Sequence, residues 1–402
     1  MKTRPGSWTP FIVIAAVVLV ALMSSATPTP LYVDYQELWG TSGTTITIVY
    51  AVYCIAVLIP LLFLGRLSDA VGRRPVILAG LALLTVSVGM LALAPNVGSL
   101  IAARILQGIS VGLITGPAAA ALIELHPRRD ARVGALTNSS TTNFGIAGGV
   151  LLAGLVATLS SSPLVFPFAI IGTATVALFG AVLALVPETS GGGSTVREAL
   201  RVRPPTVPAS MRGAFALAAV CVAVSWSVGG VFLGLGGAIS RDLLGRSDYI
   251  VTGLVVASLQ AAAGVAQLVW NLRFGPDDWR RGMTVGVLLM LPGLVVASVS
   301  LETRSVPGFL AAAALAGLGM GLLFLIGTTL VARSAPGELR GQVFAALYLV
   351  AYTSLGLPAV LAALVAEQIG LIPAYHLLAA VAAVVAAISL GVVLRGRGAV
   401  EQ

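Results

Sequence analysis

Charged residues are scarce in this chain. Only 9% of its 402 residues are Asp, Glu, Lys or Arg, and 58% are hydrophobic. Soluble domains typically carry about 25% charged residues, which they need to cover their surface. Because a membrane-spanning helix takes about 20 apolar residues, the composition excludes an ordinary soluble domain and predicts several membrane spans.

Cysteine is also rare, and no pattern for metal or nucleotide binding is present. Cys54 and Cys221 both fall inside apolar runs, which predicts two packed side chains rather than a disulfide framework. No P-loop, metal-ligand cluster or Ser/His pair indicates ATP hydrolysis, a cofactor or enzyme chemistry, so we expect no cofactor. The net charge of +8 could suggest nucleic acid, but the basic residues lie in short breaks between apolar runs, which argues against a nucleic-acid partner.

Apolar segments alternate with short polar breaks along the whole chain. Lipid offers no hydrogen-bond partners to the backbone, and no two-residue alternation indicates a membrane barrel, so these segments should be helices. The sequence therefore predicts an all-α membrane protein with twelve transmembrane helices embedded in a lipid bilayer. The spans are placed near 10–32, 44–65, 75–94, 98–124, 134–159, 163–187, 212–238, 249–272, 282–300, 308–333, 342–366 and 373–394.

The longest polar break, at 188–211, is rich in Gly, Pro and Arg and is typical of a linker. It divides the chain into an N-terminal bundle at 1–187 and a C-terminal bundle at 212–402, with six spans each. If the N-terminus is inside, the inner breaks and tails hold 19 of the Arg and Lys residues and the outer breaks only 3. This asymmetry predicts an inner-membrane protein with both termini and the linker in the cytoplasm.

The break between spans two and three has an unusual sequence, GRLSDAVGRRP at residues 65–75. Its glycines permit a tight turn and close helix approach. Its carboxylate can accept hydrogen bonds from a nearby Arg or from a helix N-terminus, which would make a latch that forms in one conformation and opens in another. Alternatively, the paired Arg residues act only as topology signals. The predicted latch residues are Gly65, Asp69, Gly72, Arg73 and Arg74.

Span four contains Arg104, the only basic residue well inside a span, followed by Gln107. Gly108, Gly112 and Gly116 continue the same helical stripe with small residues that would let a neighbouring helix approach closely. A charge inside the membrane usually has a functional role, here on an inward polar face near groups such as Asn143. The alternative is an Arg whose side chain reaches back to the outer interface.

These two elements resemble the signatures of the major facilitator superfamily, written G-x-L-[AS]-D-x-x-G-R-[KR] and R-x-x-Q-G. The break at 273–281 is similar to a degraded second copy of the first, so the resemblance covers essentially the whole chain. It implies two six-helix bundles, transport by alternating access, and a monomer. Export carriers of this superfamily usually have a G-P-x-x-G-G element in span five, whereas residues 143–149 keep the glycines without the proline. This departure weakens an assignment to proton-driven drug efflux.

No carboxylate is expected in the middle of a span, so the central cavity should be neutral or positive. This favours a neutral or weakly anionic substrate over a lipophilic cation. Any single aromatic residue could instead face lipid or the interface. The residues predicted to line the cavity or to couple ions are Asp34 at the outer mouth, Tyr50, Tyr53, Arg104, Gln107, Asn143, Trp226, Gln260, Gln267, Tyr348 and Tyr352.

Three functions from different classes follow from this reading. The first is a carrier that exports a small drug-like or metabolite molecule, with the proton as the expected coupling ion. The second is an importer or facilitator of a small nutrient, such as a sugar or organic acid, because one fold serves many functions. The third, a membrane-embedded enzyme, has no catalytic residue pattern to support it.

Overall fold

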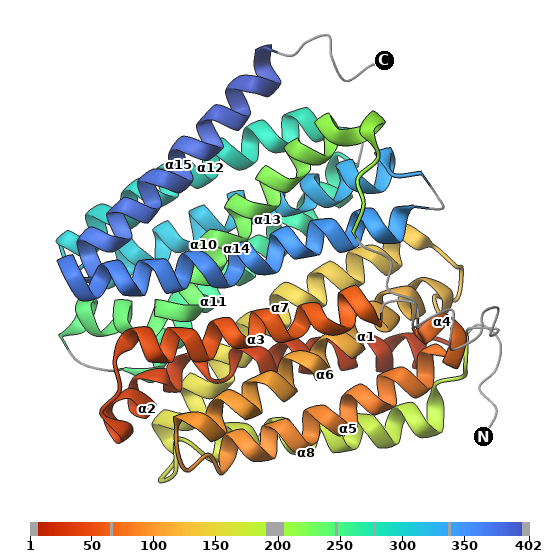
Figure 1. The fold of residues 1–402 in the computed structure, drawn as a ribbon, viewed down its shortest axis with the longest axis horizontal. Coiled ribbons are helices and arrows are strands. Elements are labelled where there is room, and N and C mark those ends of the chain that lie inside the picture. The colour runs from red at the N-terminus through yellow and green to blue at the C-terminus, as the bar shows by residue number, and fades with distance from the viewer. Residues whose placement is uncertain are drawn as a thin grey trace. The chain divides into compact units, whose positions relative to one another are not determined.

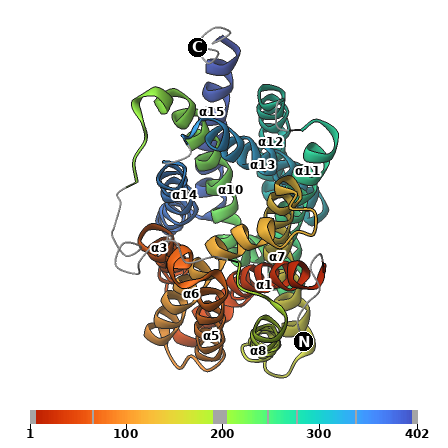
Figure 2. The same cartoon turned by 90° about the vertical axis from the view of Figure 1, so that its right-hand side faces the viewer.

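A computed structural model describes residues 7–64, 67–189, 205–245, 248–275, 278–336 and 339–395, and all regular structure in these ranges is helical (Figures 1 and 2). Twelve segments of the described chain are long and apolar enough to cross a membrane, which confirms the predicted all-α fold with twelve transmembrane helices. The helices of the first half are α1 (Thr9–Ala26), η1 (Thr29–Leu31), α2 (Tyr32–Trp39), α3 (Gly43–Phe63), α4 (Leu67–Val71), α5 (Arg73–Ala92), α6 (Val97–Glu124), α7 (Ala131–Leu159) and α8 (Phe166–Leu185). Those of the second half are η2 (Ala209–Met211), α10 (Arg212–Leu244), α11 (Tyr249–Arg273), α12 (Trp279–Glu302), α13 (Val306–Ser334), α14 (Arg340–Ile369) and α15 (Leu371–Arg395).

Several helices begin at polar residues in the short breaks. Asp130 accepts hydrogen bonds from the Arg132 and Val133 backbone amides at 2.9 and 3.1 Å, and Asp248 accepts one from the Val251 amide at 3.0 Å. These side chains satisfy amides that have no partner inside the helix. The sparse polar residues of the breaks therefore mark where spans start.

The first span is broken, although the sequence was expected to form one continuous run at 10–32. Helix α1 ends at Ala26, η1 follows, and α2 continues to Trp39. Pro28 and Pro30 have no backbone N–H, so the carbonyls four residues before them lose their helical donors. The break is the direct consequence of these two prolines.

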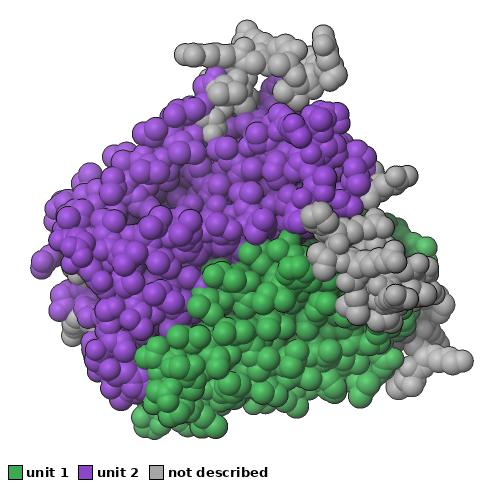
Figure 3. Space-filling view, viewed as in Figure 1, with its two compact units in different colours: residues 1–31, 52–203 green, residues 32–51, 204–402 purple. Residues whose placement is uncertain are grey.

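By contacts, the described chain forms two compact units, coloured in Figure 3. Unit 1 consists of residues 1–31 and 52–203, and unit 2 of residues 32–51 and 204–402. The chain thus passes from unit 1 to unit 2 at the break in the first span, and returns within α3. Because the units follow contacts rather than chain order, the bundle boundaries at 187 and 212 stay a prediction.

Close helix packing in unit 1 depends on glycine, as the stripe on span four predicts. A Cβ at Gly108 would lie 2.6 Å from the Tyr53 carbonyl oxygen, and one at Gly112 would lie 2.7 Å from the Val57 carbonyl oxygen. Gly116 has open space in the same position. Helix α6 therefore packs directly on the α3 backbone at Gly108 and Gly112, whereas the close approach expected at Gly116 is not made. Both cysteines are buried, and neither forms a disulfide with a described residue.

Candidate functional site

The first candidate site is built around the start of α5, at the predicted latch. Gly72 has φ +110°, a conformation that side chains rarely adopt, and it separates the short helix α4 from α5. A Cβ at this position would lie 2.8 Å from the Glu188 carboxyl carbon. Gly72 is thus required by backbone conformation and by the close approach of Glu188. Gly65 lies outside the described residues.

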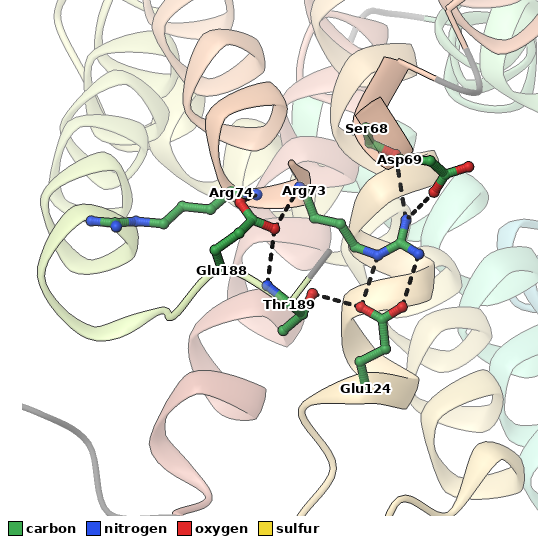
Figure 4. A network of polar contacts seen from close by, with 7 residues as sticks. All are labelled: Ser68, Asp69, Arg73, Arg74, Glu124, Glu188 and Thr189. Carbon is green, nitrogen blue, oxygen red and sulfur yellow. Dashed lines mark hydrogen bonds and ion pairs between the residues drawn. The ribbon is translucent and has the colours of Figure 1, made fainter. Parts of the chain in front are cut away.

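Arg73 is the centre of this site (Figure 4). Its Nε and Nη2 atoms each donate to the Glu124 carboxylate at 2.8 Å, which is a bidentate ion pair. Its Nη1 atom donates to Asp69 at 3.2 Å and to the Ser68 hydroxyl at 3.4 Å. The Arg73 side chain is only 16% exposed, whereas Asp69 is 53% exposed. The guanidinium therefore joins the ends of α4, α5 and α6.

Glu188 occupies the N-terminus of α5. Its carboxylate accepts hydrogen bonds from the backbone amides of Arg73 and Arg74 at 2.8 and 3.1 Å. An anion is favourable there because the amides have no helical partners and the helix dipole is positive. Thr189 links the two carboxylates, since its hydroxyl donates to Glu124 at 2.6 Å and its amide to Glu188 at 2.9 Å.

The sequence indicated only part of this network. It proposed that Asp69 accepts from Arg73 or from a helix N-terminus, and the structure shows the bond from Arg73, with Glu188 at the α5 terminus. Arg74 does not join the carboxylates through its side chain but donates to the Leu183 carbonyl. Glu124 and Glu188 were missed because they are far away in sequence. The sequence feature that could have identified them is that they are acidic residues in inner breaks whose other charged residues are mostly basic.

The second candidate site lies inside unit 1, where α6 meets the break in the first span. Gln107 Nε2 donates to the Ser24 carbonyl at 2.9 Å and to the Ser24 hydroxyl at 2.8 Å. Arg104 Nη1 donates to the Ser25 carbonyl at 3.0 Å and also to the Gln107 side-chain oxygen. Pro28 cannot supply the amide that the Ser24 carbonyl would bond in a continuous helix, and Gln107 supplies it instead.

Arg104 and Gln107 are both fully buried, so Arg104 does not reach the interface. The Arg104 guanidinium lies 4.3 Å from the Tyr53 ring centre, a cation–π contact. Its Nε and Nη2 atoms have no hydrogen-bond partner in the described part of the chain. The expected contact with Asn143 is not formed, since Asn143 is not among the partners of Arg104 and donates to the Ser139 carbonyl in its own helix.

In unit 2 two of the predicted cavity residues contact each other. Trp226 on α10 packs against Tyr352 on α14, with ring centres 4.9 Å apart. Gln260 is buried near Gly229, because a Cβ at Gly229 would lie 3.6 Å from its Nε2 atom. Gln267 instead donates to the Gly321 carbonyl on α13 at 3.3 Å.

The remaining predicted residues make other contacts. Tyr348 packs beside Phe344 within α14, with ring centres 6.4 Å apart, and is half-buried. Tyr50 is buried and lies close to Gly234 on α10. Asp34 accepts a hydrogen bond from the Tyr249 hydroxyl at 2.7 Å. In the degraded copy of the latch, Asp278 and Arg281 are 3.8 Å apart and about half exposed, and Asp277 lies outside the described residues.

A family model described as the Major Facilitator Superfamily matches residues 14–272, which is more than half of the chain. The chain belongs to the Major Facilitator Superfamily. It is therefore a multi-pass membrane protein of a transporter family. The α4–α5 junction and the Arg104 group contain the two sequence patterns that resemble signatures of that superfamily.

Parts of this chain are similar in sequence to other transporters. It is 42% identical over 86 residues to an uncharacterized transporter of Rickettsia bellii, a match covering 21% of each chain. It is 30% identical over 151 residues to the uridine/deoxyuridine transporter of Lactococcus lactis, covering 37% of this chain and 31% of that protein. It is 27% identical over 141 residues to multidrug resistance protein 2 of Bacillus subtilis, covering 35% of each. The matches thus span well under half of these curated relatives.

A solved structure extends the likeness to nearly the whole chain. A POT family transporter, solved in complex with 5-aminolevulinic acid, superimposes with a TM-score of 0.78 over 96% of both chains. The two sequences are only 14% identical, so this likeness supports the fold alone.

Proposed function

We propose that this superfamily member is a secondary active transporter that exports a small, neutral or weakly anionic, drug-like or metabolite molecule by alternating access. The observation that supports this substrate class is the environment of Arg104. Its hydrogen-bond partners are a backbone carbonyl and an amide side chain, and its ring partner is Tyr53. No carboxylate is among the partners of Arg104 in the described part of the chain, and such a buried positive charge disfavours a cationic substrate.

Export with the proton as coupling ion is the finer part of the proposal. It draws on the similarity to multidrug resistance protein 2, although span five lacks the proline of export carriers. The similarity to a uridine/deoxyuridine transporter favours a second candidate, an importer or facilitator of a polar nutrient such as a nucleoside. Both candidates use one substrate site in a monomer.

A transport experiment separates the two candidates. Accumulation of a panel of drugs, nucleosides and organic acids is measured in cells that lack or overproduce the protein. An exporter lowers the accumulation of its substrate, and a protonophore abolishes the effect if protons drive it. Raised accumulation of a nucleoside would establish the importer instead, and no change for any compound class would count against both.

The predicted latch can be tested in the same transport assay. Asp69→Asn is expected to leave insertion unchanged but to reduce transport about tenfold or more, because the charge-assisted bond to Arg73 weakens in the one state that contains it. Asp278→Asn in the degraded copy is the control, and it is expected to keep full transport. If Asp69→Asn transports as well as Asp278→Asn, the latch role is rejected.

The proposed orientation has an inner-membrane location with both termini and the linker in the cytoplasm, on the basis of the 19-to-3 distribution of basic residues. A cysteine introduced at Gly191 is expected to be inaccessible to an impermeant maleimide added to intact cells. Labelling from the outside would reverse the orientation.

A further inference from the structure

The segment of residues 32–51, hereafter the 32–51 segment, contains α2 and the first part of α3. It belongs to the first half of the sequence but groups with unit 2. The chain enters it through the break after α1, where the prolines remove helical hydrogen bonds. A short break followed by a segment that contacts a different unit is the arrangement of a hinged element.

Two carboxylates link this segment to other helices of unit 2 by hydrogen bonds. Asp34 on α2 accepts a hydrogen bond from the Tyr249 hydroxyl at the start of α11, at 2.7 Å. At the other end, Glu367 near the end of α14 accepts one from the backbone amide of Thr44 at 3.1 Å, which satisfies an N-terminal amide of α3. Each contact is made by an ionisable group, and each links the segment to one helix of unit 2.

The two carboxylates differ in their surroundings. Glu367 is exposed to solvent, so water can satisfy its second oxygen. The Oδ2 atom of Asp34 is buried and has no hydrogen-bond donor among the described residues. A buried carboxylate that stays ionised normally has donors on both oxygens. The unsatisfied Oδ2 atom is therefore where a proton would bind at the smallest cost to existing contacts.

The charged and titratable groups around Asp34 come from three helices. Tyr249 on α11 donates to it, Arg241 on α10 attracts it without forming an ion pair, and Glu37, one turn further along α2, repels it. Binding of a proton to Oδ2 neutralises the carboxylate while the Tyr249 bond to Oδ1 is retained. That bond then loses its charge assistance, and the attraction to Arg241 disappears. Both changes weaken the attachment of the 32–51 segment.

We propose that Asp34 is a proton-binding residue and that its protonation releases the 32–51 segment from unit 2. This inference rests on the proton coupling of the proposed function, for which it supplies the residue that binds the ion. The proton comes from the aqueous phase and returns to it, and no other group is consumed. Release of the segment is the conformational step that follows.

Hydrogen–deuterium exchange tests this inference without a substrate or a gradient. Purified full-length protein in lipid nanodiscs is compared at about pH 8 and about pH 5, with exchange times corrected for the intrinsic pH dependence of amide exchange. In the wild type, exchange of the 32–51 segment is expected to increase roughly threefold to tenfold at the lower pH. Helix α13, which lies within unit 2, is the internal reference and should not change.

Variants assign the response to Asp34. Asp34→Asn should show fast exchange of the segment at both pH values, because the side chain is already neutral. Glu37→Gln is the matched control, since it removes an exposed carboxylate from the same helix, and it should keep a pH response, displaced to lower pH because its repulsion of Asp34 is removed. Tyr249→Phe should exchange faster at the higher pH and is the second variant if Asp34→Asn does not fold.

A wild-type pH response in Asp34→Asn would overturn the inference. If Asp34→Asn does not fold, a wild-type pattern in Tyr249→Phe overturns it. If the exchange results are as expected but proteoliposomes show no proton-driven transport, the switch is supported and the proposed coupling ion is rejected. Proton-driven transport with a segment that does not respond to pH rejects this inference alone.

Discussion

The first span of each half of the chain is built differently. Helix α1 ends at Ala26 because Pro28 and Pro30 follow, whereas α10 runs from Arg212 to Leu244 and contains no proline. The Ser24 carbonyl in the first span therefore has no helical donor, and α10 has no comparable gap. A broken span needs donors from a neighbouring helix, and an unbroken span does not.

The helices α6 and α13, which occupy matching positions in the two halves, differ in the same way. In α6, Arg104 and Gln107 stand four residues and one residue before Gly108. In α13 the same positions before Gly317 are Ala313 and Ala316, while the backbone contact is kept, since a Cβ at Gly317 would lie 2.8 Å from the Leu259 carbonyl carbon.

The close glycine contact is therefore present in both helices, whereas the polar pair occurs in α6 and not at the matching positions of α13. We conclude that Arg104 is explained first by the backbone carbonyl to which it donates a hydrogen bond, and only second by a role in substrate transport.

The largest expected effect tests the polar pair itself. Arg104→Ala should lower the free energy of unfolding by about 3 kcal/mol, because it leaves a cavity and two buried acceptors without their donor. Transport should be lost as well. Arg104→Lys keeps a donor and should lose less stability. Unfolding in a denaturing detergent and transport in proteoliposomes measure both, and full activity of Arg104→Ala would remove the pair from the mechanism.

A smaller effect tests the packing that the two halves share. Gly108→Ala and Gly317→Ala should each cost about 1–3 kcal/mol of unfolding free energy, because each new methyl group would overlap the backbone of the adjacent helix. Gly116→Ala, which enters open space, should be neutral or slightly stabilising. A large difference between the Gly108 and Gly317 variants, measured by the same unfolding assay, would show that the halves are not packed alike.

A double-mutant cycle tests the link between proline and amide. Gln107→Ala alone should cost about 1 kcal/mol, because the Ser24 carbonyl loses its donor. In the Pro28→Ala background the restored backbone amide can bond that carbonyl, so the same substitution should cost about half as much or less. Unfolding free energies of the four proteins give the coupling, and strict additivity would mean that Gln107 acts independently of the break.

The smallest expected effect is that of replacing Gln267, the buried amide side chain on α11 in the second half. Gln267 donates to the Gly321 carbonyl, but α13 is continuous there and the Leu325 amide can bond the same oxygen. Gln267→Ala should therefore cost about 0.5 kcal/mol or less, below the cost of Gln107→Ala. Equal costs for the two variants in the unfolding assay would contradict the comparison.

The twelve spans could be predicted because apolar composition alone determines which segments can cross a bilayer. The break in the first span could not be placed, although Pro28 and Pro30 were visible, because membrane helices tolerate proline when neighbours satisfy the freed carbonyls. Whether a neighbour does so depends on packing.

The candidate sites show the same limit. Asp69, Gly72 and Arg73 form a recognisable local pattern, whereas Glu124 and Glu188 reach that pattern through tertiary contacts. Arg104 and Gln107 were identified as an unusual pair inside a span. Their acceptors, the Ser24 and Ser25 carbonyls, could not be identified, because backbone atoms carry no sequence signal.

The two buried cysteines have a practical consequence. Bulky, water-soluble thiol reagents need access to the sulfur, and Cys54 and Cys221 are 1% and 2% exposed. A cysteine introduced at an exposed residue such as Leu38 would then react far faster than either native thiol. The unaltered sequence is thus a ready background for fluorescent and spin-label probes on α2.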